Sequence, residues 1–179
     1  MRRSLAQSLE WTFEDCEAGA RSNAWAMLVS QLDYDAHRFG HTQALRDIDE
    51  AERGEIGRLL DDLHWLGVCD LLPVGIDYLM FEASLFCGRY VAAMLLQRAI
   101  AADVVDGHIT DATLRAIDDY EEPTLISLFL DTSGEFYVAS EARPQWAEDE
   151  VRLRERAMAL IAQDGRPRSA GTGYSPIEE

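Results

Sequence analysis

The chain has 179 residues, of which 47% are hydrophobic and 27% charged; this composition fits one compact domain and excludes a collagen, a mucin and a disordered tail. Its 33 acidic residues outnumber 16 basic residues, all of them Arg, and give a net charge of −17. Because such a surface repels phosphate and other anionic groups, we expect no nucleic-acid partner and no docking on anionic lipid or wall polymers.

Helical periodicity dominates the chain. The first clear helix is predicted from Asp49 to Gly67, with capping-box spacing between Asp49 and Glu52 and a glycine where the helix should stop. Its apolar stripe comprises Ile56, Leu59, Leu60, Leu63 and Leu66. A second helix is predicted over residues 74–86, with Pro73 in its first turn. Its apolar stripe comprises Ile76, Leu79, Met80, Ala83 and Phe86.

The segment 88–102 is apolar nearly all round and is predicted to be the central buried helix. Beyond a turn at Asp106 and Gly107, Thr110 is expected to cap a short helix, and Pro123 is expected to open a longer one. The inward side chains of the longer helix are predicted to be Leu125, Leu128, Phe129, Thr132 and Phe136. A last helix is expected over about 145–162, with a buried stripe of Trp146, Leu153, Ala157, Leu160 and Ile161.

No segment shows the sustained alternation that is typical of strands, so the sequence predicts an all-α protein. We expect a single compact helical domain over residues 1–163. Residues 164–179 are rich in Gly, Pro and Ser without an apolar period, and are expected to form a flexible polar tail that is disordered or lies along a partner.

Cys16, Cys69 and Cys87 show neither close pairing nor metal-ligand spacing, so we expect no disulfide framework, no metal and no other cofactor. The two arginines at the N-terminus are followed by no apolar segment, and no stretch is long enough to span a membrane. The sequence therefore predicts a protein that is made in the cytoplasm without a signal peptide and has no membrane partner.

A series of motifs runs from His64 to Asp118: a Trp, a Leu-Pro-x-Gly-x-Asp-Tyr helix start, a Leu-Leu-Gln-Arg-Ala helix and a Val-Asp-Gly-x-Ile turn. In this order and spacing the segment resembles the glycoside hydrolase family 108 muramidases of phages and bacteria. The matching residues are Trp65, Leu72, Pro73, Gly75, Ile76, Asp77, Tyr78, Phe81, Glu82, Gly88, Leu95, Leu96, Gln97, Arg98, Ala99, Val105, Asp106, Gly107, Ile109, Thr113 and Leu114. Including weaker similarity on both sides, the resemblance covers roughly residues 5–161. It implies a lysozyme-like helical fold and cleavage of the peptidoglycan glycan.

Glycoside hydrolysis needs a carboxylic acid that stays protonated near neutral pH. In the resembling family this acid is the Glu of a Trp-Glu-Gly-Gly-Tyr segment, whereas here Trp11 is followed by Thr12 and then by residues 13–15, Phe-Glu-Asp. The family's Asn-Ser-Gly turn becomes Phe-Cys-Gly at residues 86–88, and the Arg expected on the helix that carries Asp131 is Ser133 or Gly134. The former cleft is therefore predicted to comprise Thr12, Asn23, Phe86, Cys87 and Gly88, with no catalytic residue.

An altered helix end offers three replacement acids, Glu10, Glu14 and Glu17. Glu14 is the best of them, because it lies near the expected position and Trp11 and Phe13 are placed to desolvate it. If the protein is active, Glu14 is the expected catalytic residue. The competing interpretation is a solvated acid on the first helix of a very acidic protein.

The remaining candidates favour structural roles. His37 and His41 have the spacing of zinc ligands, but Gly40 interrupts the turn and no further ligand completes a set. Cys87 has only Arg89 nearby to lower its pKa and is interpreted as a packing residue.

Four functions are weighed. The first is a non-catalytic structural or adhesion component of a phage or gene-transfer particle, with protein neighbours as partners and the virion or lysate as its location. The second is an active peptidoglycan muramidase with a relocated Glu, for which peptidoglycan is the partner. The third is an acidic decoy or inhibitor of a basic host protein, and the fourth is a regulator of a genuine muramidase.

Overall fold

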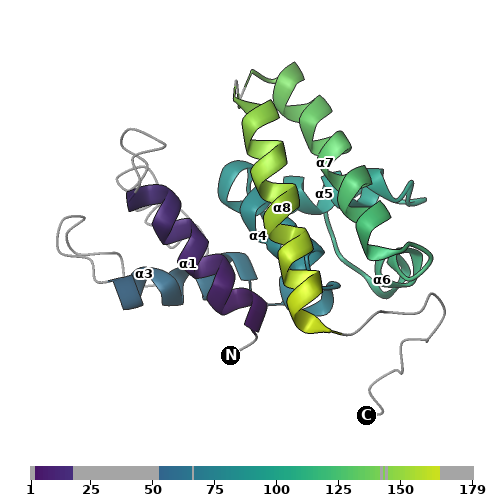
Figure 1. The fold of residues 1–179 in the computed structure, drawn as a ribbon. Coiled ribbons are helices and arrows are strands. Elements are labelled where there is room, and N and C mark those ends of the chain that lie inside the picture. Colours follow the sequence, from purple (N-terminus) through teal and green to yellow (C-terminus); the bar gives the residue numbers. More distant parts are fainter. Residues whose placement is uncertain (1–2, 18–52, 66, 142, 144, 166–179) are drawn as a thin grey trace, which may run out of the picture. The chain divides into compact units, whose positions relative to one another are not determined.

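A computed structural model of the chain describes residues 3–17, 53–65, 67–141, 143 and 145–165 (Figure 1). Among these residues there are helices and turns but no β-strand, which confirms the predicted all-α class. The chain divides into two compact units, Met1–Asp70 and Leu71–Glu179, and each is described by itself. Within the described ranges no helix combines the length and the apolar character that crossing a membrane requires.

The first unit contains α1 (Arg3–Glu17), α3 (Arg53–Leu60) and the π-helical turn η1 (Asp61–Trp65). Helix α1 is amphipathic, because its buried positions recur at helical spacing while Glu10 and Glu14 are exposed. Two of the buried positions are polar, and each hydroxyl donates to the carbonyl oxygen one turn earlier: Ser8 Oγ to Ser4 O at 2.7 Å and Thr12 Oγ1 to Ser8 O at 2.9 Å. These bonds satisfy both hydroxyls inside the helix itself.

The predicted helix over residues 49–67 is only partly regular. Asp49 and Glu52 lie outside the described residues, and the α-helical part ends at Leu60, where the backbone widens into η1. Trp65 Nε1 donates to Asp70 Oδ1 at 3.1 Å, and Gly67 follows with φ 78°. The helical segment has therefore ended before Gly67, as predicted. The positive φ at this position favours glycine, which has no Cβ.

The second unit contains α4 (Ile76–Cys87), α5 (Arg89–Ala99), α6 (Asp111–Ile117), α7 (Glu122–Ala139) and α8 (Trp146–Asp164). The short 3₁₀ turn η2 (Cys69–Leu71) spans the boundary between the units. Helix α4 packs against α5, α7 and α8, and α7 lies along α8 (Figure 1). The core of this unit therefore forms around α4.

The identity of the central helix differs from the prediction. Every residue from Ile76 to Ser84 is buried, whereas α5 exposes Tyr90 and Arg98, so α4 and not the 88–102 segment is the most enclosed helix. The sequence concealed this because α4 buries carboxylates. Asp77 is one of them, and its Oδ1 accepts from the N–H groups of Gly75 and Tyr78 at 2.8 and 2.7 Å.

The start of α4 also differs from the prediction. The helix begins at Ile76, three residues after Pro73, with Gly75 at its N-terminal cap. Pro73 contributes its carbonyl oxygen, which accepts from the Asp77 N–H at 3.0 Å. The proline therefore precedes the helix and does not occupy its first turn.

The two helix starts predicted further along are confirmed. Thr110 caps α6 in a reciprocal capping box with Thr113, and Pro123 lies in the first turn of α7. The predicted inward face of α7 is wrong at Leu128, Thr132 and Phe136, which are only half-buried; in each case the next residue along the chain is buried instead. The buried face consists of Leu125, Ile126, Phe129, Leu130, Ser133, Gly134 and Tyr137.

Gly134 explains this rotation of α7. A Cβ at Gly134 would lie 2.5 Å from Trp146 Nε1, so the glycine lets the Trp146 indole pack directly on the α7 backbone.

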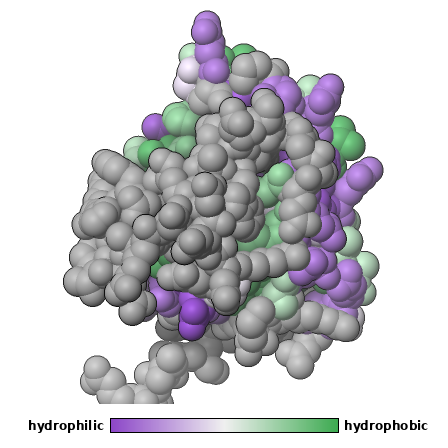
Figure 2. Space-filling view, turned by 90° about the vertical axis from the view of Figure 1, so that its left-hand side faces the viewer, coloured by the Kyte–Doolittle hydropathy of each residue, from purple (hydrophilic) through white to green (hydrophobic). Residues whose placement is uncertain are grey.

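Helix α8 buries Trp146, Leu153, Ala157 and Leu160 as predicted, while Ile161 is half-buried. It ends at Asp164, close to the predicted domain limit; the tail beyond residue 165 lies outside the described residues. On the face in Figure 2, hydrophilic residues are prominent on the described surface.

Candidate functional site

The predicted cleft residues fall in both units. Thr12 and Glu14 lie on α1, Phe86 to Gly88 form the junction of α4 and α5, and Asn23 lies outside the described residues. Each half is therefore described separately.

The α1 half presents two of the three replacement acids among its described side chains; the side chain of Glu17 lies outside them, and the neighbouring Asp15 is half-buried. Glu10 and Glu14 are exposed, although Phe13 is buried and Trp11 half-buried beside them. Thr12 occupies the position where the resemblance places the catalytic Glu. It is buried, and its hydroxyl donates a hydrogen bond to the Ser8 carbonyl oxygen. Glu14, the expected catalytic residue of an active protein, therefore lies on the solvent-facing side of α1.

The α4–α5 half is built on Gly88. This residue ends α4 and precedes α5 with φ 79°, and its N–H donates to Ser84 O at 2.9 Å. A side chain at this φ would be strained, so the position favours glycine. The direction change that Gly88 permits leaves Phe86 and Cys87 on the last turn of α4.

Phe86 packs against an arginine from another part of the unit. The Arg143 guanidinium lies 3.7 Å from the Phe86 ring centroid, and it is also 5.6 and 5.5 Å from the rings of Tyr137 and Trp146. The Phe86 and Tyr137 rings meet edge to face at 6.2 Å. Where the resembling family has a hydrogen-bonding Asn, this chain therefore has a ring that covers a cation.

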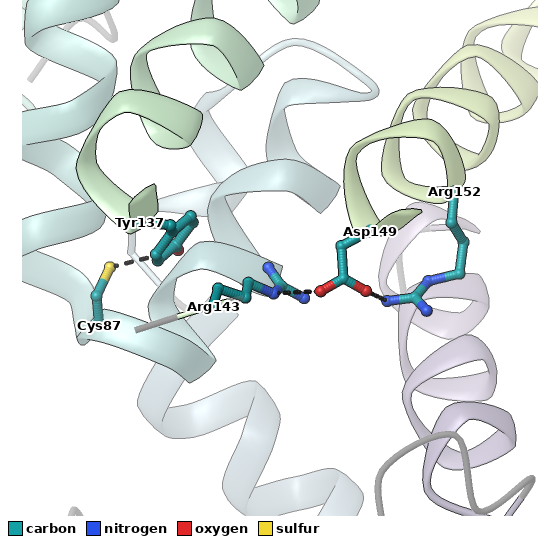
Figure 3. Close-up of polar contacts among 5 residues, drawn as sticks. All are labelled: Cys87, Tyr137, Arg143, Asp149 and Arg152. Carbon is teal, nitrogen blue, oxygen red and sulfur yellow. Dashed lines mark hydrogen bonds and ion pairs between the residues drawn. The ribbon is translucent and has the colours of Figure 1, made fainter. Parts of the chain in front are cut away.

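The charge of Arg143 is balanced inside the protein (Figure 3). Arg143 Nε lies 2.6 Å from Asp149 Oδ2, and the other Asp149 oxygen lies 2.6 Å from Arg152 Nη2. Asp149 thus lies between two arginines at the start of α8. We call Phe86, Tyr137, Arg143, Trp146 and Asp149 the aromatic–arginine cluster; it joins the ends of α4, α7 and α8.

The thiol of Cys87 lies next to the aromatic–arginine cluster and is hydrogen-bonded on both sides. It donates to Ala83 O at 3.1 Å and accepts from the Tyr137 hydroxyl at 3.8 Å. Burial raises the pKa of Cys87 to about 11, although the Tyr137 hydrogen bond and the nearby Arg143 lower it in part. Burial also raises the pKa of Tyr137. Cys87 is therefore protonated at neutral pH, and the cation that acts on it is Arg143 rather than Arg89.

Sequence reasoning missed this cluster because Arg is rarely buried and Arg143 lies between helices. One signal was present. Asp149 occupies the same stripe of α8 as Trp146 and Leu153, three and four residues away, and an acid on a buried stripe needs a cation. A small cavity of about 10 Å³ lies beside the cluster, lined in part by Ser133 and Leu153.

The loop between α5 and α6 is held by one buried side chain. Gln97 Oε1 accepts from the N–H groups of Asp106 and Gly107 at 3.0 and 2.8 Å, and its Nε2 donates to Asp106 Oδ1 and His108 O at 3.0 and 2.9 Å. Gly107 has φ 78°, a backbone conformation that favours glycine in this turn. The Gln of the Leu-Leu-Gln-Arg-Ala motif and the Asp-Gly of the following turn, which both carry the resemblance, are thus hydrogen-bonded to each other.

His37 and His41 lie outside the described residues, His64 is buried in η1, and His108 is exposed beside Tyr90. In the part of the chain that the structure describes, no group of three His, Cys, Asp or Glu side chains is placed to hold a metal ion.

These features define an all-α protein in which aromatic and arginine packing occupies one half of the predicted cleft. No family model and no curated protein matches the chain. Its structure is similar to that of SagA from Brucella abortus, with a TM-score of 0.63 and 20% sequence identity. The match covers 74% of this chain and 76% of that chain. At this identity, the similarity shows a shared fold.

Proposed function

We propose that this protein is a non-catalytic relative of the family 108 muramidases that serves as a structural or adhesion component of a phage or gene-transfer particle. The proposal combines the sequence resemblance with the fold shared with SagA. In this proposal the protein acts in the virion or the lysate, and its partners are neighbouring proteins.

The observation that carries the proposal is how the chain uses the positions where the resemblance expects substrate-facing groups. Thr12 is buried and donates its hydroxyl to the helix backbone. Phe86 covers Arg143, and Cys87 is hydrogen-bonded to Ala83 and Tyr137. Groups engaged in this way stabilise the fold and offer a glycan neither a proton donor nor an amide.

The net charge supports the same proposal. A charge of −17 disfavours contact with an anionic wall polymer, whereas it suits a contact with a basic protein surface. The charge alone is equally compatible with an acidic decoy; the resemblance to phage muramidases and the altered cleft positions are what support the particle component.

The first test is turnover of peptidoglycan. The purified full chain is incubated with purified sacculi, and the release of reducing sugar ends is compared with that from a working muramidase and from the Glu14→Gln variant. We expect no release above buffer from either form of this protein. Release by the unaltered protein that is lost in Glu14→Gln would establish the alternative, a muramidase that uses Glu14.

The second test is location. Particles from producing cells are sedimented and their proteins are identified by mass spectrometry, with a soluble lysate protein as the control for carry-over. The proposal expects this chain in the particle fraction at a constant ratio to the major structural proteins. A chain that stays entirely in the supernatant would refute the particle role.

A further inference from the structure

Helix α8 carries a second apolar stripe, on the side turned away from the core of its unit. The side chains of this stripe recur at helical spacing and are all exposed: Ala147, Val151, Met158 and Ala162. The two larger ones, Val151 and Met158, are 58% and 40% exposed. At the helical rise per residue, the stripe extends for about 22 Å. We call these four residues the outer α8 stripe.

The outer α8 stripe has the same order of side-chain sizes from either end. Alanines lie at its two ends and the larger Val151 and Met158 lie inside them, and each pair is equidistant from the midpoint between Arg154 and Glu155. A twofold contact needs this symmetry, because residue i of one copy meets residue j of the other, and j meets i. When two copies of α8 are paired antiparallel about that midpoint, Val151 of each copy lies opposite Met158 of the other.

One border of the stripe carries charges that suit the same pairing. Glu148, Arg152 and Glu155 lie along this border, and Arg152 Nη2 donates to Asp149 Oδ1 at 2.6 Å. A twofold axis places like borders of the two helices side by side. Arg152 of one copy therefore comes within one turn of Glu155 of the other, and the reverse pair forms as well. Opposite charges meet twice across this border.

The other border carries an ion pair within each copy. Arg154 Nη2 lies 2.8 Å from Glu150 Oε1 of the same helix, and Arg154 Nη1 donates to Ser127 Oγ of α7 at 2.7 Å. Two Arg154 side chains would meet near the midpoint, but each keeps its own Glu150, and the exposed Asp131 of α7 lies one turn from Ser127. Arg156 lies on the side of α8 away from the stripe. Both borders thus combine acids and arginines, in contrast to the net charge of −17 over the whole chain.

We propose that two copies of this chain pair antiparallel through their outer α8 stripes. In this pair Val151 of each copy packs against Met158 of the other, the alanines let the helix ends approach closely, and two Arg152–Glu155 pairs fix the direction. The contact is shorter than a standard protein interface, so we expect a weak dimer. The inference goes beyond the proposed function, because it concerns the chain in solution; in a particle, multivalency would strengthen such a contact.

Other occupants fit the stripe less well. A partner with charges of one sign would meet both signs at the borders, and a nucleic acid would meet the acids of an already acidic chain. A glycan would meet apolar side chains that offer its hydroxyl groups no hydrogen bond. The same helix in the reverse direction presents matching side-chain sizes and both signs of charge at matching positions.

Cysteine cross-linking tests the direction and the register of the pair. Val151→Cys and Met158→Cys are each made in a Cys16→Ser background, because Cys69 is buried and the Cys87 thiol is hydrogen-bonded. The two variants are mixed, mildly oxidised and analysed by mass spectrometry. We expect a disulfide between the two variants and little between identical copies, whose cysteines would lie about 10 Å apart along the axis. Disulfides mainly between identical copies, or none above the Cys16→Ser background, would overturn the antiparallel pair.

Sedimentation equilibrium of the full chain over a concentration series measures the strength of the pair. Val151→Ser changes both copies and should weaken self-association by at least about tenfold. Val104→Ser, at a valine that is 61% exposed on the loop between α5 and α6, is the matched control and should leave self-association unchanged. A chain that stays monomeric at every concentration, or an equal effect of the two variants, would overturn the proposal.

Added salt separates an apolar contact from an association that follows charge alone. Salt screens the repulsion between two copies of net charge −17, so self-association should hold or tighten as the salt concentration rises. Dissociation by salt would overturn the stripe as the basis of the dimer. A dimer in solution together with a chain absent from particles would refute the proposed function and leave this inference standing. Unfolding curves of each variant verify that the fold is retained.

Discussion

Asp149→Asn is expected to destabilise the protein strongly, because it leaves the guanidinium of Arg143 inside the fold without its carboxylate. The two side chains are 1% and 4% exposed, and their charged atoms lie 2.6 Å apart. Removing one partner of such a buried pair costs about 3–5 kcal/mol. That is a large part of the ~5–15 kcal/mol by which domains are stable. For a chain of this size it corresponds to a fall in melting temperature of roughly 6–20 °C.

Urea unfolding followed by far-UV circular dichroism measures this effect, and the chain offers a matched control. Arg154 and Glu150 form an ion pair at 2.8 Å, but their side chains are 36% and 32% exposed. Glu150→Gln should therefore change the free energy of unfolding by less than about 1 kcal/mol.

A double variant tests the reasoning further. Arg143→Met with Asp149→Leu removes both buried charges and should recover most of the stability that Asp149→Asn loses, because the ion that still loses its carboxylate, Arg152, is 29% exposed and reaches water. The reasoning fails if Asp149→Asn unfolds within about 1 kcal/mol of the unaltered protein. It fails also if the double variant is as unstable as the sum of the two single replacements.

Three further predictions concern other contacts. Gln97→Ala should cost about 1–3 kcal/mol and speed hydrogen exchange at the loop amides that it holds; unchanged exchange would contradict the role assigned to it. Gly134→Ala should destabilise by about 1–3 kcal/mol because its methyl meets Trp146, whereas Gly54→Ala, with open space around it, should be neutral or stabilising in thermal unfolding. The stability of the protein relative to Cys87→Ser should be constant below about pH 9. It should fall by about 3 kcal/mol towards pH 11, because the unfolded thiol ionises there first; urea titrations showing no fall would refute the raised pKa.

The helices of this protein were largely predictable because they follow from local patterns. The cap at Thr110, the proline in the first turn of α7 and the stripe of α8 each depend on residues close together in the sequence. The predictions that failed depended on contacts between helices. The inward face of α7 is set by Gly134 against Trp146, and no periodicity within α7 contains that contact.

Buried polar groups explain the other differences. Helix α4 was predicted to have one apolar stripe, yet Asp77 and Glu82, which lie outside that stripe, are buried as well. The cluster around Arg143 was missed for the same reason, since a charged residue is assigned to the surface unless its partner is known. Of the candidate site, the structure places Glu14 on the exposed face of α1, and its role as the catalytic acid of an active protein stays a prediction.

The positions that depart from the muramidase pattern are tied to the stability of this fold, which bears on how the proposed loss of catalysis would be reversed. Phe86 covers an arginine that is itself paired in the interior, so Phe86→Asn would uncover that charge as well as restore an amide. Thr12→Glu would place a carboxyl at a buried position of α1. Each single reversion therefore opposes the packing of the element that carries it. Under the proposed function, restoring a cleft would therefore require changing these supporting contacts together with the cleft residues.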